Sequence, residues 1–136
     1  MSSFNIFNIA GSGMAAQTVR LNTVASNLAN ANSVSGDPAQ VYRARHPVFQ
    51  AVRAGGTDQA GAAVEVLGIT ESQAAPLARY EPGNPLADAN GYVYSPNVSV
   101  VEEMVDMISA ARSYQSNVEV INTSKELLMA TLRLGS

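Results

Sequence analysis

The distribution of proline constrains the fold of this chain more than any other feature of its sequence. All six prolines lie between residues 38 and 96, together with seven of the ten glycines. Because proline interrupts helices and glycine weakens them, long helices are confined to the two ends. The sequence therefore predicts two helical ends, residues 1–35 and 97–136, around a middle of short strands and turns, residues 36–96.

The last forty residues carry the clearer helix signals. Ser99 and Glu102 have the spacing of a capping box, and Arg133 and Gly135 supply a cation and a stop at the far end. A helix from about 100 to 134 would be roughly 50 Å long, too long for a compact domain of 14.2 kDa to cover. Its heptad seam, polar only at Lys125, consists of Val100, Met104, Met107, Ala111, Tyr114, Val118, Ile121, Lys125, Leu128 and Leu132.

The amino-terminal end has a weaker heptad seam. Gly11 and Gly13 interrupt it, at a cost of about 1 kcal/mol each relative to alanine, so the helix is expected to be marginal alone. Its two columns are Phe7, Met14, Leu21 and Leu28, and Ala10, Gln17, Val24 and Ala31. We expect the two ends to pair as antiparallel, coiled-coil-like helices through Phe7, Met14, Leu21, Leu28, Met104, Met107, Tyr114, Val118, Ile121 and Leu128.

The first 36 residues carry a single charged side chain, that of Arg20. Their other polar positions are Asn, Ser, Thr, Gln and Gly, whereas a surface helix normally has a charged outer face. This composition favours a helix covered on more than one side by protein, through hydrogen bonds to amides and hydroxyls. The alternative is a partly disordered, uncharged tail.

The middle segment is predicted to form a small sheet or an extended β-hairpin. Turns are expected at Pro82-Gly83 and Asn90-Gly91, and a mobile loop over residues 54–63. Alternating or β-branched runs predict strands over residues 41–46, 48–52, 62–69 and 91–94. The predicted fold class is thus mainly α, with an inner helical part and a small β-rich outer part.

Composition excludes several classes of function. The chain has no cysteine, which removes disulfides, thiolate metal sites and cysteine nucleophiles. A net charge of −3 gives no basic field for phosphate backbones, so nucleic acid is not an expected partner. No run approaches the roughly 18 apolar residues of a membrane span, and no charge before Arg20 supplies the basic start of a cleaved signal peptide.

The remaining polar residues assemble no plausible active site, metal site or cofactor site. His46 is the single histidine and has no second ligand of its kind. Asp88 and Asn90 lack the other oxygens of a calcium loop, so a hairpin turn is the better interpretation. We therefore expect no enzyme, no cofactor and no small-molecule substrate.

Two further groups have structural interpretations. The carboxylates of Glu102, Glu103 and Asp106 are explained by the dipole of the helix that they begin. Gly11 and Gly13 lack the lysine of a phosphate loop, and instead indicate a close approach between two helices.

Two stretches resemble a known family. LNTVASNLANANS, residues 21–33, resembles the SNLANANT-type signature of bacterial flagellar axial proteins, the rod and hook group, with Ser33 where threonine is frequent. Residues 80–129, from YEPGNPLADANGYVYSP to KELLM, look like the proximal-rod C type of basal-body rod protein in this family. These stretches and the short length separate the chain from the longer distal-rod and hook subunits.

The resemblance implies a structural subunit of the basal-body rod, which spans the periplasm. Such subunits are exported unfolded through the flagellar type III apparatus without a cleaved signal, then polymerise into a helical tube that acts as drive shaft and export channel. Expected partners are other copies, other rod subunits, MS-ring or rod-base adaptor proteins and the export apparatus. The residues expected at contacts between subunits are Asn22, Ser26, Asn27, Asn30 and Asn32.

Two other classes stay open from the residues alone. One is a soluble coiled-coil adaptor, or a secreted effector of a type III secretion-related system, whose heptads pair with a different partner. The other is an interfacial membrane binder that uses the amino-terminal helix, although such helices carry Lys and Arg on their polar face and only Arg20 is available.

Overall fold

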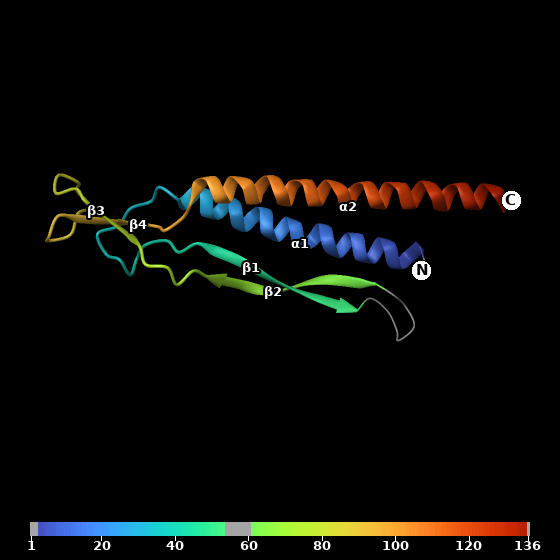
Figure 1. The fold of residues 1–136 in the computed structure, drawn as a ribbon, viewed down its shortest axis with the longest axis horizontal. Coiled ribbons are helices and arrows are strands. Elements are labelled where there is room, and N and C mark those ends of the chain that lie inside the picture. Colours follow the sequence, from blue (N-terminus) through green and yellow to red (C-terminus); the bar gives the residue numbers. More distant parts are fainter. Residues whose placement is uncertain (1–2, 54–60, 136) are drawn as a thin grey trace.

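Two long helices and two β-ribbons make up the protein (Figure 1). The computed structural model describes residues 3–53 and 61–135. Its elements in chain order are α1 (Ser3–Asn30), β1 (Arg45–Arg53), β2 (Ala62–Glu71), β3 (Leu77–Tyr80), β4 (Tyr92–Ser95) and α2 (Val100–Leu134). The predicted fold class, mainly α with a small β-rich middle, is confirmed.

Helices α1 and α2 lie side by side and run in opposite directions, and the end of α2 projects past the start of α1 (Figure 1). The predicted start of α2 is confirmed, because the Ser99 side chain accepts a hydrogen bond from the Glu102 amide at 3.4 Å. At the other end, the Gly135 amide donates to the Thr131 carbonyl at 3.1 Å. The long helix predicted over about 100 to 134 is therefore present.

Gly13 lets the two helices approach closely. A Cβ atom at this position would lie 2.8 Å from Nδ2 of Asn117 on α2, whereas a Cβ at Gly11 would meet nothing within 4 Å. The close approach expected from this glycine pair therefore occurs at Gly13 alone, and Gly11 lies beside open space.

The β1–β2 hairpin packs against α1 on the side away from α2 (Figure 1). Its antiparallel register runs from Arg45 opposite Glu71 to Arg53 opposite Ala62, with an irregularity between Val48 and Phe49. An isolated two-stranded ribbon is marginally stable in water. Contact with α1 is therefore what holds this hairpin in place.

The strand boundaries differ from the prediction in three ways. Residues 41–44 precede β1, which begins at Arg45. Val41 and Ala44 among them are both buried, and their spacing of three residues does not follow the alternation of a strand. The expected loop over residues 54–63 falls partly outside the described residues, and its last two residues, Ala62 and Ala63, already belong to β2. Strand β3 was not predicted, since four residues are too few for a periodic signal.

The β3–β4 ribbon lies beyond the start of α2 and is closed by a turn around Asp88 (Figure 1). The Asp88 carboxylate accepts hydrogen bonds from the amides of Asn90 at 2.9 Å and Tyr92 at 2.8 Å. Gly91 has a φ of 85°, which favours glycine. The predicted Asn90-Gly91 turn is present, and the Tyr92 amide contributes most to a lowered pKa of the Asp88 carboxyl.

The core is built from small side chains. In residues 3–53 and 61–135, the largest fully buried side chains are those of Val93, Asn27 and Pro96. Leucine, isoleucine, methionine and phenylalanine of the described chain are all partly open to solvent. The protein therefore folds with much of its large apolar surface uncovered.

Acid should release the Asp88 turn. Because the folded pKa of Asp88 lies below its ordinary value of 3.8, the carboxylate stabilises the turn above that value and the contribution is lost as the pH falls through the folded pKa. We expect the Tyr92 amide resonance to titrate below pH 3.8. In Asp88→Asn that titration should be absent, and an unchanged titration curve would contradict this account.

The two glycines of α1 should respond differently to alanine. Gly11→Ala should stabilise the protein by about 0.5 to 1 kcal/mol in urea unfolding, since helix propensity rises and nothing is displaced. Gly13→Ala should gain less, because the Asn117 side chain must move. Equal gains at both positions would show that α1 and α2 are not in close contact at Gly13.

Candidate functional site

A buried asparagine joins α1, α2 and the start of β1. Asn27 on α1 is 0% exposed. Its Nδ2 donates to the Arg45 carbonyl at 2.9 Å and to Oε2 of Glu103 at 3.1 Å. Its Oδ1 accepts from the Arg45 amide at 2.9 Å and from the Tyr42 hydroxyl at 2.8 Å. All four hydrogen-bonding positions of the side chain are used.

Further polar contacts surround this junction. The Ser26 and Tyr42 hydroxyls lie 3.1 Å apart, and since the Tyr42 hydroxyl donates to Asn27, Ser26 is the donor. The Arg45 guanidinium lies 5.7 Å from the centre of the Tyr42 ring. About two turns earlier on α1, Arg20 pairs with Asp106 of α2 at 2.9 Å. These contacts fix the angle between the helices and the direction in which the hairpin leaves.

The expectation that Asn27 contacts a neighbouring subunit is wrong, because its side chain is fully buried and all four of its hydrogen-bonding positions are taken. Ser26 is half-buried against Tyr42, and Asn30 donates to the Ser26 carbonyl at 2.8 Å. Asn22 and Asn32 are exposed. Contacts between subunits at Ser26, Asn30, Asn22 and Asn32 remain predictions.

Sequence reasoning missed the partners of Asn27. Glu103 was assigned to the helix dipole, and Tyr42 and Arg45 were assigned to a strand pattern. Their spacing of 15 to 76 residues from Asn27 carries no local signal. The one available hint was the absence of charge around an asparagine-rich segment, which indicated burial without naming the partners.

The face of α2 that meets α1 is shifted by one residue from the predicted seam. Glu103 and Ala110, seven residues apart, are buried, whereas the predicted seam residue Met104 is 55% exposed. Placing Met104 in the seam was therefore wrong. The reason is that Glu103 turns inward to bond Asn27, and close approach at Gly13 requires small residues on α2. Met107, Tyr114, Val118, Ile121 and Leu128 are half-buried, and their pairing with α1 stays a prediction.

On α1 the small and large apolar residues are separated. The small residues Ala10, Val24 and Ala31 are buried, at 3%, 4% and 8% exposure. Phe7, Met14, Leu21 and Leu28, which are the large members of the predicted seam, are only half-buried. The helix pair thus leaves its largest apolar side chains partly uncovered.

Two of the three sides of α1 are covered within the chain. The hairpin covers one of them, where the Val64 amide donates to Oγ of Ser12 at 3.0 Å. Neighbouring subunits are therefore not needed on that side, which corrects part of the interpretation of its hydroxyl-rich sequence. The exposed third side, here called the α1 outer face, is uncharged and comprises Phe4, Asn8, Ala15, Thr18, Asn22, Ala25 and Ala29, with half-exposed Gly11 between them.

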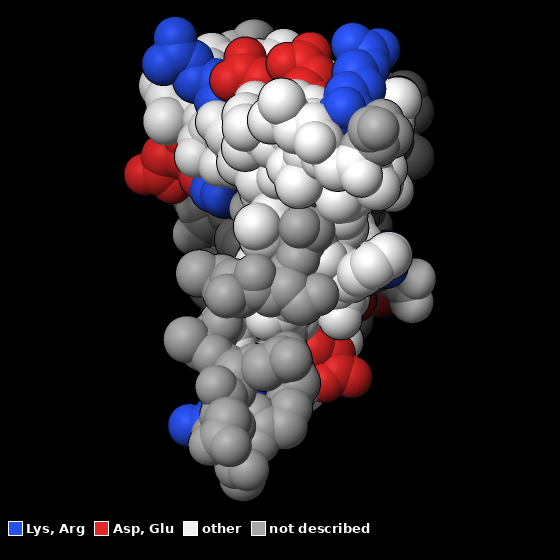
Figure 2. Space-filling model, turned by 90° about the vertical axis from the view of Figure 1, so that its right-hand side faces the viewer, with Lys and Arg blue, Asp and Glu red and all other residues white. Residues whose placement is uncertain are grey.

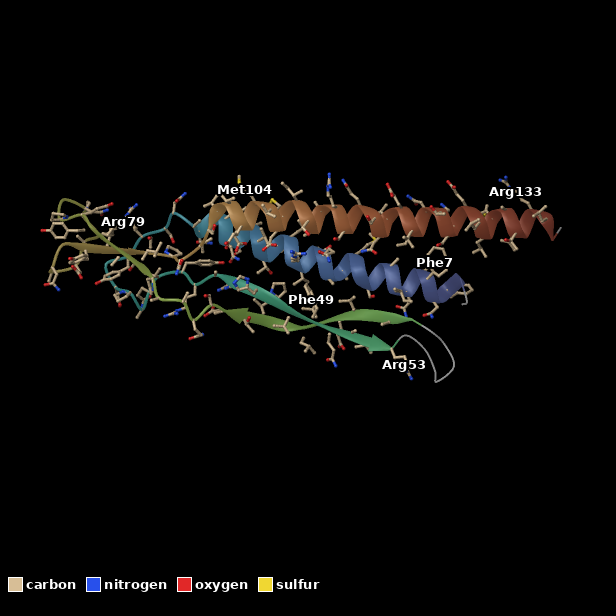
Figure 3. The ribbon with its side chains drawn as sticks, in the orientation of Figure 1. Phe7, Phe49, Arg53, Arg79, Met104 and Arg133 are labelled. Carbon is tan, nitrogen blue, oxygen red and sulfur yellow. The ribbon has the colours of Figure 1, made fainter. Side chains whose placement is uncertain are left out.

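Helix α2 carries a separate apolar strip near its start, here called the α2 ridge. Val101, Met104, Val105 and Ile108 are 72%, 55%, 60% and 60% exposed. Their spacing of three and four residues places them on one face of the helix. Figure 3 shows Met104 on the side of α2 that is turned away from α1. The ridge is therefore beyond the reach of the chain's own α1.

Charged side chains gather over α2 at the end where this helix finishes (Figure 2). Below them, over α1, the described surface of this end is mostly uncharged. Leu127, Leu132 and Leu134, near the end of α2, are 64%, 63% and 90% exposed. This end of the molecule therefore combines charged side chains over α2 with uncharged surface over α1 and exposed leucines near the end of α2.

His46 and the carboxylates were considered above as ligands of a small molecule or a metal, and the described residues do not bring them together. His46 is exposed on β1, opposite Thr70. No group of three or more His, Asp or Glu side chains lies close enough together there to hold a metal ion. In the same residues, neither helix combines the length and hydropathy needed to cross a membrane.

Comparison with known proteins gives one consistent result. Residues 7–36 match the family model of flagella basal body rod proteins, and residues 89–134 match that of the carboxyl-terminal region of flagellar basal body rod FlgEFG proteins. The chain is 58% identical over 135 residues to the flagellar basal-body rod protein FlgC of Salmonella typhimurium, covering 99% of both chains. FlgC of Escherichia coli O157:H7 is 57% identical over 135 residues, again with 99% coverage. FlgC of Aquifex aeolicus is 45% identical over 131 residues and 96% of each chain.

Removing the Asn27 side chain should destabilise the fold strongly. Asn27→Ala leaves the Arg45 amide and the buried Glu103 carboxylate each without its Asn27 partner, so we expect a loss of about 2 to 4 kcal/mol in urea unfolding. The matched control is Asn22→Ala on the exposed face of the same helix, which should stay within about 0.5 kcal/mol. Similar losses for the two variants would contradict the proposed role of the junction.

Proposed function

The chain belongs to the family of flagellar basal-body rod proteins, and on that premise we propose that its copies polymerise through repeated head-to-tail contacts into the proximal part of the rod. It is a structural subunit of the rod in the flagellar basal body, where it assembles with other rod components. The observation that carries this conclusion is the 58% identity with a basal-body rod protein over 99% of both chains.

The exposed apolar surface supports polymerisation. Phe7, Met14, Leu21 and Leu28 are half-buried in the isolated chain, and burying such side chains fully contributes roughly 1.5 to 3 kcal/mol each. Contacts between two different faces of identical subunits continue without closing, and so form filaments or tubes. A subunit with its large apolar residues outside is suited to this form of assembly.

The proposed tube would transmit motor torque as a drive shaft and enclose the export channel. In it, residues 1–35 and 97–136 would form the inner helical domain, and residues 36–96 the outer β-rich part. The helix pair would provide the rigid element, because α1 and α2 are joined by the Arg20–Asp106 ion pair as well as the Asn27 junction. The intrachain seam of large residues would tighten when neighbouring subunits cover it.

We also propose that the chain passes unfolded through the flagellar type III export apparatus and meets MS-ring or rod-base adaptor proteins at the base of the rod. Support comes from a core without large buried side chains among the described residues and from Gly11 inside α1. Both features keep the monomer weakly stable, so that assembly supplies much of the final stability. The proposal requires no catalytic step, and a soluble adaptor or effector is disfavoured by the full-length identity with rod proteins.

A charge in the helix seam should prevent incorporation. Leu28→Asp or Ile121→Asp places a carboxylate among half-buried apolar side chains, which is costly without a partner. Basal bodies purified from a strain with either variant as its sole copy should lack the subunit, and the cells should not swim in soft agar.

Thr123→Asp, at an exposed position of α2 two residues from Ile121, is the matched control and should leave motility intact. A motile strain carrying full-length Leu28→Asp or Ile121→Asp protein would count against the proposed role of this seam.

A further inference from the structure

The isolated chain exposes far more surface than a compact protein of its mass. Its accessible surface is 8895 Å², whereas a compact monomer of 14.2 kDa exposes roughly 6,800 Å². The excess is about 2,100 Å² on one chain, whereas a standard interface buries roughly 800 Å² of each partner. Part of this excess surface follows from the elongated shape. Large apolar side chains contribute to the surface that this shape exposes.

Apart from the carboxyl-terminal end of α2, the α2 ridge is the most exposed apolar strip on the two helices. It consists of four branched or long side chains, each at least 55% exposed, over about two helical turns. The buried residues Glu103 and Ala110 occupy the opposite face of α2, so turning the ridge toward α1 would break the hydrogen bond between Glu103 and Asn27. A ridge with spacings of three and four residues fits a groove between the side chains of another helix.

The α1 outer face has the complementary shape. Its side chains are short from Gly11 onward, and it carries no charge whose desolvation would oppose burial. The shallowest part lies at Gly11 and Ala15, since a Cβ built at Gly11 meets nothing within 4 Å. A helix packed there would approach the backbone of α1 closely.

We propose that the α2 ridge of one copy packs into the α1 outer face of a second copy, centred on Gly11 and Ala15. This inference rests on the proposed polymerisation and specifies its contact. The two surfaces are different and lie on different helices, so a pair of copies still has one free α2 ridge and one free α1 outer face. The contact is therefore heterologous and repeats from copy to copy. It also gives Gly11 a role in packing, because a side chain at this position would meet nothing within 4 Å in the isolated chain.

Disulfide trapping tests this contact without background, since the chain has no cysteine of its own. Met104→Cys and Ala15→Cys, each with a different epitope tag, are expressed together as the sole copies in one strain. Basal bodies are purified and oxidised with copper phenanthroline. We expect a two-chain band carrying both tags, at least tenfold stronger than for the control pair Met104→Cys with Gln50→Cys, whose second cysteine lies on the exposed hairpin.

A second pair, Val101→Cys with Thr18→Cys, samples the same contact one turn away and covers the case in which the first pair fails to assemble. Basal bodies that contain both variants of either pair but give no band with both tags would overturn the inference and leave the rod assignment intact. A ridge cysteine trapped only to another rod protein would overturn it as well. Absence of even the unmodified chain from basal bodies would instead contradict the proposed function.

A larger side chain at Gly11, which would fill the α1 outer face, provides an independent readout. Gly11→Leu should preserve or raise the helicity of the monomer by circular dichroism, because leucine is a strong helix former and the site is open. The same change should weaken the Val101–Thr18 disulfide band at least tenfold, whereas Gly11→Ala should weaken it less. An unchanged band in Gly11→Leu would overturn the proposed packing of the α2 ridge against Gly11.

Discussion

The arrangement of this protein depends on the four hydrogen bonds of one buried side chain. Asn27 joins α1 to the start of β1 through both backbone groups of Arg45, and to α2 through Glu103. These bonds turn Glu103 inward, and the rotation of α2 follows from that contact. With α2 in this rotation, Met104 and Ile108 face outward. A polar contact inside the molecule thus decides which apolar surface is presented outside it.

The distribution of side-chain size follows from the same geometry. Helices that approach closely at Gly13 leave room between them only for small residues such as Ala10 and Ala110, which are buried. Leu21 and Leu28 lie at the edge of the contact and are half-covered. In a monomeric enzyme this would be a poor core, because packing density and burial supply most of the stability. In a rod subunit the missing burial is available from neighbouring copies, so weak folding before assembly and firm folding after it are compatible.

Features encoded by neighbouring residues were readable from the sequence. The cap at Ser99, the long helix that follows it and the turn at Asn90-Gly91 all arise from contacts within a few residues. Their energetics is local, so a linear pattern identifies them. The position of Met104 could not be read in this way, because two apolar columns lie side by side on α2 and periodicity alone does not rank them. Asn27 was similarly misplaced, since its partners Tyr42 and Glu103 are distant in the chain.

By itself, then, the sequence determined the two helical ends, the β-rich middle between the prolines, and membership of the rod family through residues 21–33 and 80–129. Only the tertiary structure decided which face of each helix is covered, because that choice depends on long-range hydrogen bonds and on close approach at Gly13. It placed the hairpin on one side of α1 and left the α1 outer face and the α2 ridge free. The surfaces available for assembly are what remains after those intrachain contacts are made.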